Sequence, residues 1–239
     1  MLLYMAISIT KRRKALGLSQ EELAVRFGVS RPTLNKIELG ERSLSVAEKQ
    51  KLEDIFKALE SLPSEDDMRI SVPVQNIEKF KQVLLYILEQ VGAKPNVGMT
   101  VLYKLLYFID FDFYEKYEKQ LIGLTYIKNT HGPTPREFVS VVRELKESGD
   151  IIEVRSKYFA HEQKKFLPNR TADLSLLSAQ ELEMVDDVLR RYADKSATQL
   201  SEMTHRDTPW KVTEDGQNID YEFAFYRPDE FSVRDYGEL

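Results

Sequence analysis

Apolar residues recur every three or four positions over much of the chain, and this spacing predicts helices separated by short turns. Ser19 and Glu22 form a capping box before a first short helix, and Gly28 ends that helix. Ser30 caps a second helix, which has a proline in its first turn, and Gly40 closes it. Two short helices joined by a tight turn predict a helix-turn-helix.

Two further helices are predicted to complete a compact helical head. One ends near Leu16, with Gly17 as its stop, and its basic run 11–14 is expected on or beside a face that approaches phosphate. The other begins after Ser45, where Glu48 completes another capping box. Its apolar side is predicted to consist of Val46, Leu52, Ile55, Phe56 and Leu59.

Residues 63–75 break the helical pattern with two prolines beside an acidic cluster, which predicts a linker between two domains. Beyond it, apolar residues from Ile77 to Val91 recur at helical spacing. The next segment, 100–114, is apolar almost all round, so we expect it to be the central and most buried helix of the second domain. It is too short to span a membrane.

The rest of the second domain mixes strands with helices. Residues 122–128 alternate and predict a strand followed by a turn. Residues 134–137 have the pattern of a capping box that opens a helix running to Gly149. Residues 151–154 and 158–167 predict a two-stranded ribbon directly after that helix, placed as a wing would be.

Capping signals open the last helices. Ser178 and Ser196 each begin a capping box, and Thr208 is interpreted as a cap followed by Pro209 and Trp210. The charged segment from Arg227 is expected to be loosely held. The predicted fold class is mainly α, and α+β overall: an all-α head, then a helical domain with a small antiparallel sheet. The predicted limits are 1–62 for the head, 63–75 for the linker, 76–226 for the second domain and 227–239 for the tail.

The composition and the distribution of charge indicate the cellular compartment of the protein and the kind of partner it binds. The chain has no cysteine, which excludes disulfides and thiolate metal sites and favours the cytoplasm. The apolar start runs directly into basic residues, the wrong order for a signal peptide. Residues 1–62 hold 11 Lys and Arg against 8 Asp and Glu, and the remainder holds 23 against 31. A basic head suits a polyanion, whereas the acidic remainder argues against nucleic acid wrapping around it.

The second helix of the motif leaves a polar surface on the side away from Leu34 and Ile37. That surface comprises Arg31, Pro32, Asn35 and Lys36, with Thr33 at its edge. A helix of this kind lies in the major groove, where Arg and Lys suit guanine acceptors and Asn suits adenine.

Residues 5–60 resemble the Xre/Cro (lambda-repressor-like) domain on the strength of these caps, glycines and spacings. The resemblance implies that Gln20 bonds a phosphate and that Arg42 contacts the DNA backbone. It also implies that Arg31, Thr33 and Lys36 face bases. The expected partner is double-stranded operator DNA, bound by a homodimer across an inverted repeat.

The second domain resembles the Panacea antitoxin domain over most of residues 77–226. The resemblance rests on 104–110, the Gly132–Pro133 pair, the turn at 149–151, and 196–205 followed by Pro209 and Trp210. Matching positions expected to be structural are Lys104, Asp110, Gly132, Pro133, His205, Pro209 and Trp210. The resemblance implies an antitoxin of a toxin–antitoxin system, acting in phage defence, that binds and neutralises a protein toxin encoded by a neighbouring gene.

A catalytic alternative draws on the histidines and carboxylates of the second domain: His131, His161, His205, Asp110, Asp112 and Asp207. None has the spacing of a metal-binding or nucleophilic motif, so we interpret them as structural and expect no cofactor and no enzymatic activity. Lys104 is interpreted as a snorkelling or paired core lysine rather than a partner contact. The predicted function is toxin neutralisation with repression of the protein's own operon. The alternatives are a ligand-sensing repressor and a hydrolase with a regulatory head.

Overall fold

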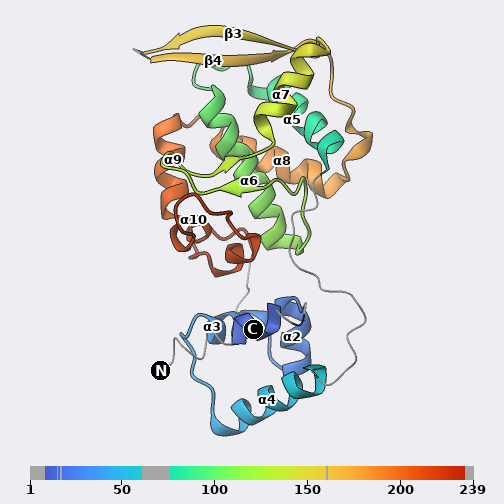
Figure 1. Ribbon diagram of the computed structural model, residues 1–239, viewed down its shortest axis with the longest axis vertical. Coiled ribbons are helices and arrows are strands. Elements are labelled where there is room, and N and C mark those ends of the chain that lie inside the picture. Colours follow the sequence, from blue (N-terminus) through green and yellow to red (C-terminus); the bar gives the residue numbers. More distant parts are fainter. Residues whose placement is uncertain (1–8, 15, 17, 61–75, 160, 235–239) are drawn as a thin grey trace. The chain divides into compact units, whose positions relative to one another are not determined.

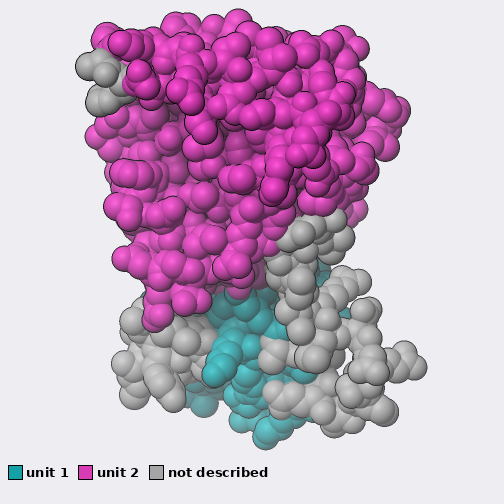
Figure 2. Space-filling model, turned by 45° about the horizontal axis from the view of Figure 1, so that its top comes forward, with its two compact units in different colours: residues 1–72, 235–239 teal, residues 73–234 magenta. Residues whose placement is uncertain are grey.

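The computed structural model describes residues 9–14, 16, 18–60, 76–159 and 161–234, apart from the side chains of 58–60 and 161. The chain divides into two compact units, residues 1–72 with 235–239 and residues 73–234 (Figure 2). We call them the head and the body and describe each by itself. The linker predicted at 63–75 lies outside the described residues.

The head is built from the helix at residues 9–14 and three labelled helices: α2 (Gln20–Phe27), α3 (Arg31–Glu38) and α4 (Val46–Glu60). The predicted capping box is present: the Ser19 hydroxyl accepts from the Glu22 amide, and the Glu22 carboxylate accepts from the Ser19 amide. Gly28 ends α2 with a φ of 81°, a left-handed value that favours glycine. The capping prediction for the helix-turn-helix is therefore confirmed.

The core of the head joins its helices through eight buried apolar residues. They are Ile9, Leu23, Ala24, Phe27, Leu34, Ile37, Leu52 and Phe56. Val46 departs from the prediction, because it is 85% exposed. It is the first residue of α4 and lies beyond the turn that packs on the core.

Two long helices form the centre of the body: α5 (Ile77–Val91) and α6 (Met99–Tyr117). Nearly every side chain of α6 is buried, as its all-round apolar character predicts, including Lys104, Asp110, Asp112 and Glu115. Figure 1 shows the other elements of the body arranged around α6.

The remaining elements cover α5 and α6. They are β1 (Tyr126–Ile127), β2 (Thr134–Pro135), α7 (Phe138–Glu147), β3 (Ile151–Tyr158), β4 (His161–Pro168), η1 (Leu174–Leu176), α8 (Ala179–Tyr192), α9 (Ala197–Arg206), α10 (Thr208–Val212) and η2 (Tyr221–Tyr226). β1 pairs antiparallel with β2, and β3 pairs antiparallel with β4. The fold is mainly α with small antiparallel sheets, which confirms the predicted class.

Residues 134–137 do not open a helix, so that prediction was wrong. Thr134 and Pro135 form β2, and α7 begins only at Phe138 without a side-chain cap. The Glu137 carboxylate, expected to complete a capping box, instead accepts from the Thr125 amide at 3.1 Å. Thr208 likewise lies inside α10, and its hydroxyl donates to the Tyr226 carbonyl at 2.9 Å instead of capping the helix. Long-range pairing replaces the local cap at both places.

The segment from Arg227 is not loosely held over its described part, so that expectation was also wrong. Arg227 is 6% exposed and Phe231 is 5% exposed, and residues 227–234 belong to the same compact unit as the body. The described residues contain no helix with the length and apolarity needed to cross a bilayer.

Candidate functional site

A buried polar network holds the recognition helix α3 in place within the head. The Arg13 guanidinium donates to Glu38 on α3 at 2.8 Å, and neither side chain is exposed. The Gln20 amide, at the start of α2, donates to the same Glu38 carboxylate at 2.8 Å and is itself buried. Three helices therefore meet at one carboxylate, which fixes the angle between α2 and α3.

This network places two of the predicted DNA contacts inside the head. Gln20 was expected to bond a phosphate, but its amide nitrogen is held by Glu38 and lies 3.4 Å from Asn35. Its amide oxygen accepts from Arg31 Nε at 3.3 Å, and Arg31 is 3% exposed. A direct contact of Gln20 or Arg31 with DNA would require them to exchange these bonds.

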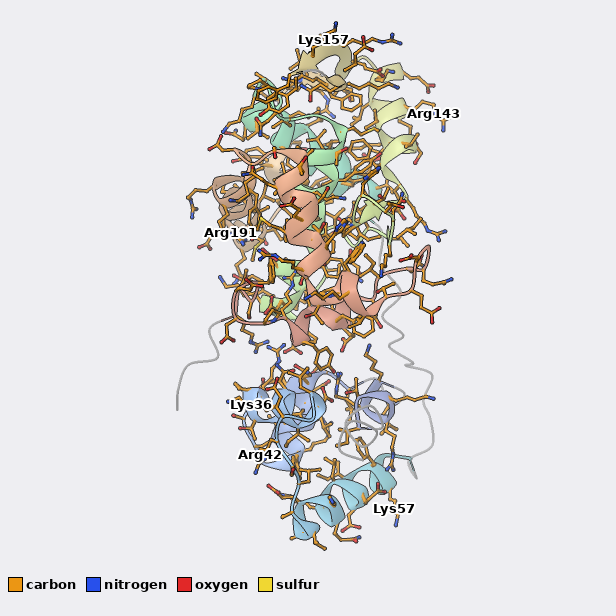
Figure 3. All side chains as sticks on the ribbon, turned by 90° about the vertical axis from the view of Figure 1, so that its left-hand side faces the viewer. Lys36, Arg42, Lys57, Arg143, Lys157 and Arg191 are labelled. Carbon is orange, nitrogen blue, oxygen red and sulfur yellow. The ribbon has the colours of Figure 1, made fainter. Side chains whose placement is uncertain are left out.

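The other predicted contacts lie nearer the surface. Lys36 is exposed and forms no ion pair with any described residue, and Figure 3 shows it at the surface of the head. Thr33 and Asn35 are half-buried, and the Thr33 hydroxyl lies 2.9 Å from the Ser30 hydroxyl at the helix start. Arg42 donates to Glu48 at 2.7 Å, so part of its charge is already paired.

The basic run at 11–14 does not form one phosphate-facing surface as expected. Arg13 is fully buried against Glu38. Arg12 lies over the Phe56 ring at 4.5 Å and pairs with Glu53 at 2.6 Å. Two of the four cations therefore hold the head together.

In the body, Asp110 acts as a buried acceptor for the loop after α6. Its carboxylate accepts from the amides of Ile122, Gly123 and Leu124 at 2.8 to 3.3 Å, and from the hydroxyls of Tyr126 and Tyr221 at 3.0 and 3.1 Å. Burial raises the pKa of Asp110, and the donors oppose that rise. These bonds tie the 121–124 loop, β1 and η2 to the central helix.

A second buried centre is the Arg227 cluster, which comprises Arg227, Asp112, Glu115 and Asp207. The guanidinium contacts Asp112 at 2.7 Å, Glu115 at 3.1 Å and Asp207 at 2.8 Å, and all four side chains are buried. Arg191 provides a further partner for Asp112 at 2.5 Å. Burial opposes the charge of Arg227, but the three carboxylates outweigh it and raise the pKa of Arg227 above its usual value.

The Arg227 cluster was not predicted from the sequence. Asp112 and Glu115 stand three residues apart on an otherwise apolar helix, a spacing that indicates one shared face. Nothing local distinguishes Arg227 from an exposed arginine, because its partners lie on α6 and at the start of α10.

A third centre surrounds Lys104. Its side chain is 1% exposed, so it does not snorkel, and Nζ donates to the Pro133 carbonyl at 3.0 Å. A Cβ added at Gly132 would lie 2.7 Å from Lys104 Nζ and 2.6 Å from the Thr204 hydroxyl, so only glycine fits there. Burial lowers the pKa of Lys104 to about 7. The Gly132–Pro133 pair is thus packed directly on α6.

His205 and Trp210 lie beside this centre. Their rings stack at 4.2 Å, and Lys128 lies over Trp210 at 4.2 Å. Burial, together with the nearby charge of Lys104, lowers the pKa of His205. Pro209 between them is buried in the first turn of α10. The matching positions of the Panacea resemblance thus lie in two places, around Lys104 and at Asp110.

The histidines and aspartates considered for catalysis are not brought together as one site. Asp110 is occupied by backbone amides and tyrosines, and Asp112 and Asp207 are occupied by arginines. Within the described part of the chain, no group of three or more His, Asp or Glu side chains is arranged to hold a metal ion.

Comparison with known families agrees with this geometry. The family model described as Antitoxin SocA-like, Panacea domain, matches residues 102–211, and a helix-turn-helix family model matches residues 9–59. No curated protein and no solved structure matches the chain. The first match covers α6 to α10, and the second covers the helices of the head.

The two matches together cover the helices of the head and most of the body. The chain joins an N-terminal helix-turn-helix domain to an antitoxin-like Panacea domain.

Proposed function

We propose that this protein is an antitoxin that binds and neutralises a protein toxin encoded by a neighbouring gene, and that represses its own operon through the head. It acts in the cytoplasm without catalysis. The match of the Panacea antitoxin family to residues 102–211 carries this proposal.

The structure of the body supports binding rather than chemistry. The buried carboxylates on α6 are saturated by donors from the 122–124 loop, η2 and the 227–234 segment, so they build the fold. A rigid body assembled in this way presents a fixed surface to a partner, which limits the entropy lost on binding.

The head supports operator binding through α3. Lys36 is exposed on this helix, and the Arg13–Glu38–Gln20 network fixes the helix against α2. A single head covers one half-site, so we propose a homodimer on an inverted repeat. Thr33, Asn35 and Arg42 complete the proposed DNA surface, with Arg31 and Gln20 in reach if their mutual bond opens.

The decisive experiment for neutralisation uses the neighbouring open reading frame. Its product is expressed from an inducible promoter, alone and together with this chain. We expect growth arrest in the first case and growth in the second. If the neighbouring product does not arrest growth, or if the full chain fails to restore it, the antitoxin proposal is wrong.

Operator binding is tested by gel shifts with the upstream region of the operon. Lys36→Ala should cost about 1–3 kcal/mol of specific affinity, the value of one good base contact. The matched control for this variant is Lys57→Ala on α4, and Lys49→Ala with Lys57→Ala matches the double variant below, since both lysines are exposed. An Arg31→Ala, Lys36→Ala double variant that still folds and shifts the operator like wild type would show that α3 does not read DNA.

A further inference from the structure

The β3–β4 ribbon carries a group of cations that the proposed function of the body does not use. Arg155 and Lys164 are direct partners in the register, and Lys157 is two residues further along the same face. All three side chains are exposed. Figure 1 shows the two strands along one end of the body, and Figure 3 shows Lys157 at that end.

The opposite face of the ribbon is held to the body, and this hold extends into the outer half, residues 155–158 and 161–164, because Gln163 lies opposite Ser156. Gln163 and Lys165, on the opposite face, donate to the backbone carbonyls of Pro95, Ala93 and Lys94 at 2.5 to 3.1 Å. Towards the base, Glu153 pairs with Lys146 of α7 at 2.6 Å. The cationic face of the outer half therefore points away from Gln163 and Lys165, whereas Glu153 lies on that face nearer the base.

Two carboxylates share this face with the three cations: Glu153 lies two residues before Arg155, and Glu162 lies directly opposite Lys157. Arg155 and Lys157 form no ion pair with any residue that the structure describes, and Lys164 lies 3.7 Å from a Glu153 carboxylate already held by Lys146. Like charges directly opposite each other destabilise an antiparallel pair. Arg155 nevertheless stands directly opposite Lys164, and an anion placed between them would offset their repulsion.

The tip of the ribbon adds an aromatic side chain. Phe159 is 86% exposed and has a φ of 53°, a left-handed value that is rare for a bulky residue. Its ring contacts Tyr158 at 4.6 Å. A two-residue connection between the paired Tyr158 and His161 requires a positive φ of this kind, so the turn itself places the ring at the tip. The turn thus holds an apolar ring in solvent beside three cations.

We propose that the outer half of the β3–β4 ribbon is a second DNA-binding element, which contacts the phosphate backbone through Arg155, Lys157 and Lys164 and inserts or stacks Phe159 at a base step. The major groove admits a two-stranded ribbon, and apolar wedges such as Phe enter between base steps. The ribbon would bind DNA in addition to the head, so this inference rests on the proposed DNA binding of the chain.

Charge and area favour DNA over a protein partner. Phe159 stands among charged side chains, and one exposed ring falls far short of the roughly 1,000 Å² of a stable protein interface. A polyanion is matched by the three cations, which outnumber the two carboxylates, Glu153 and Glu162, on the same face. The acidic remainder of the body would keep the contact confined to the ribbon.

The test measures the salt dependence of DNA binding by the full chain. A mixed-sequence duplex serves as the probe between about 50 and 200 mM salt, where each phosphate contact contributes about 0.9 to the slope of log K against log salt. The variant Arg155→Ala, Lys157→Ala, Lys164→Ala should lower the magnitude of that slope by about 2–3. The matched control Lys116→Ala, Lys119→Ala, Lys211→Ala removes the same charge from exposed sites elsewhere on the body and should leave it unchanged.

Phe159→Ala separates the ring from the charges. It should weaken binding about tenfold at each salt concentration without altering the slope, because an apolar contact releases no counterions. The thermal midpoint should not fall, since the ring is exposed. A fall in the midpoint would show instead that Phe159 has a structural role.

Equal slopes for the ribbon variant and its control would overturn the inference while leaving the head as the DNA-binding domain. A ribbon variant that binds DNA like wild type but no longer rescues cells from the neighbouring toxin would also overturn it, by showing that the ribbon contacts the toxin. If the wild-type chain shows no salt-dependent binding to any duplex, the proposed function of the head fails as well.

Discussion

Replacing Arg227 by Met should destabilise the body more than any change at a surface ion pair. In the wild type, the guanidinium contacts Asp112, Glu115 and Asp207 at 2.7 to 3.1 Å, and the four side chains are buried. Arg227→Met fills similar space but leaves Glu115 and Asp207 without their cation. Removing one partner of a buried ion pair costs about 3–5 kcal/mol, and a single arginine here serves three carboxylates, so the expected loss is at least that large.

The loss should depend on pH in a defined direction. Burial raises the pKa of Glu115 and of Asp112, and the charge of Arg227 opposes that rise. Without the arginine, the folded-state pKa of both groups rises further above the unfolded value. A carboxyl with a raised folded pKa stabilises the fold fully below its unfolded pKa, and this contribution is lost as the pH rises through the folded pKa. The deficit of the variant should therefore be smaller at pH 5 than at pH 7.

Urea unfolding followed by tryptophan fluorescence is the appropriate assay, because the one tryptophan, Trp210, lies in the body and reports on that unit alone. Arg190→Met is the control: its pair with Asp187 is largely exposed and should contribute less than about 1 kcal/mol. A loss below about 1 kcal/mol for Arg227→Met, or a deficit that grows on acidification, would refute the view that this cluster stabilises the body.

Three further predictions concern the fold of the body and its independence. Gly132→Ala should destabilise the body by about 1–3 kcal/mol more than Gly149→Ala in urea unfolding, because both have positive φ but only Gly132 has atoms within 2.7 Å of the added Cβ. Lys104→Met should raise the thermal midpoint at pH 6 more than at pH 9. Because the pKa of Lys104 is lowered to about 7 in the folded state, the wild type gains stability as the pH rises from that value to the higher pKa of the unfolded state. An equal rise in the midpoint at both pH values would contradict this. A fragment of residues 70–239 should fold alone and rescue cells from the neighbouring toxin; a folded fragment that fails where the full chain succeeds would show that the head takes part in neutralisation.

The local signals of the sequence were sufficient for most helices. Capping boxes at Ser19, Ser178 and Ser196 are present as predicted, because a cap depends only on residues within one turn. The apolar residues on all sides of 100–114 also predicted the central helix of the body, because a helix that is apolar all round is stable only when it is buried. The matched families could be recognised from the same local motifs.

Only the tertiary structure decided how the polar residues inside those elements are used. The capping pattern at Thr134 was overridden by pairing with β1, and the charged Arg227 became buried because three carboxylates distant in sequence converge on it. Gln20 has the sequence position of a phosphate contact, yet its amide is held by Glu38 on another helix. Long-range partners determine whether a polar side chain is a surface group or part of the core, because burial of charge is tolerated only where such partners meet it.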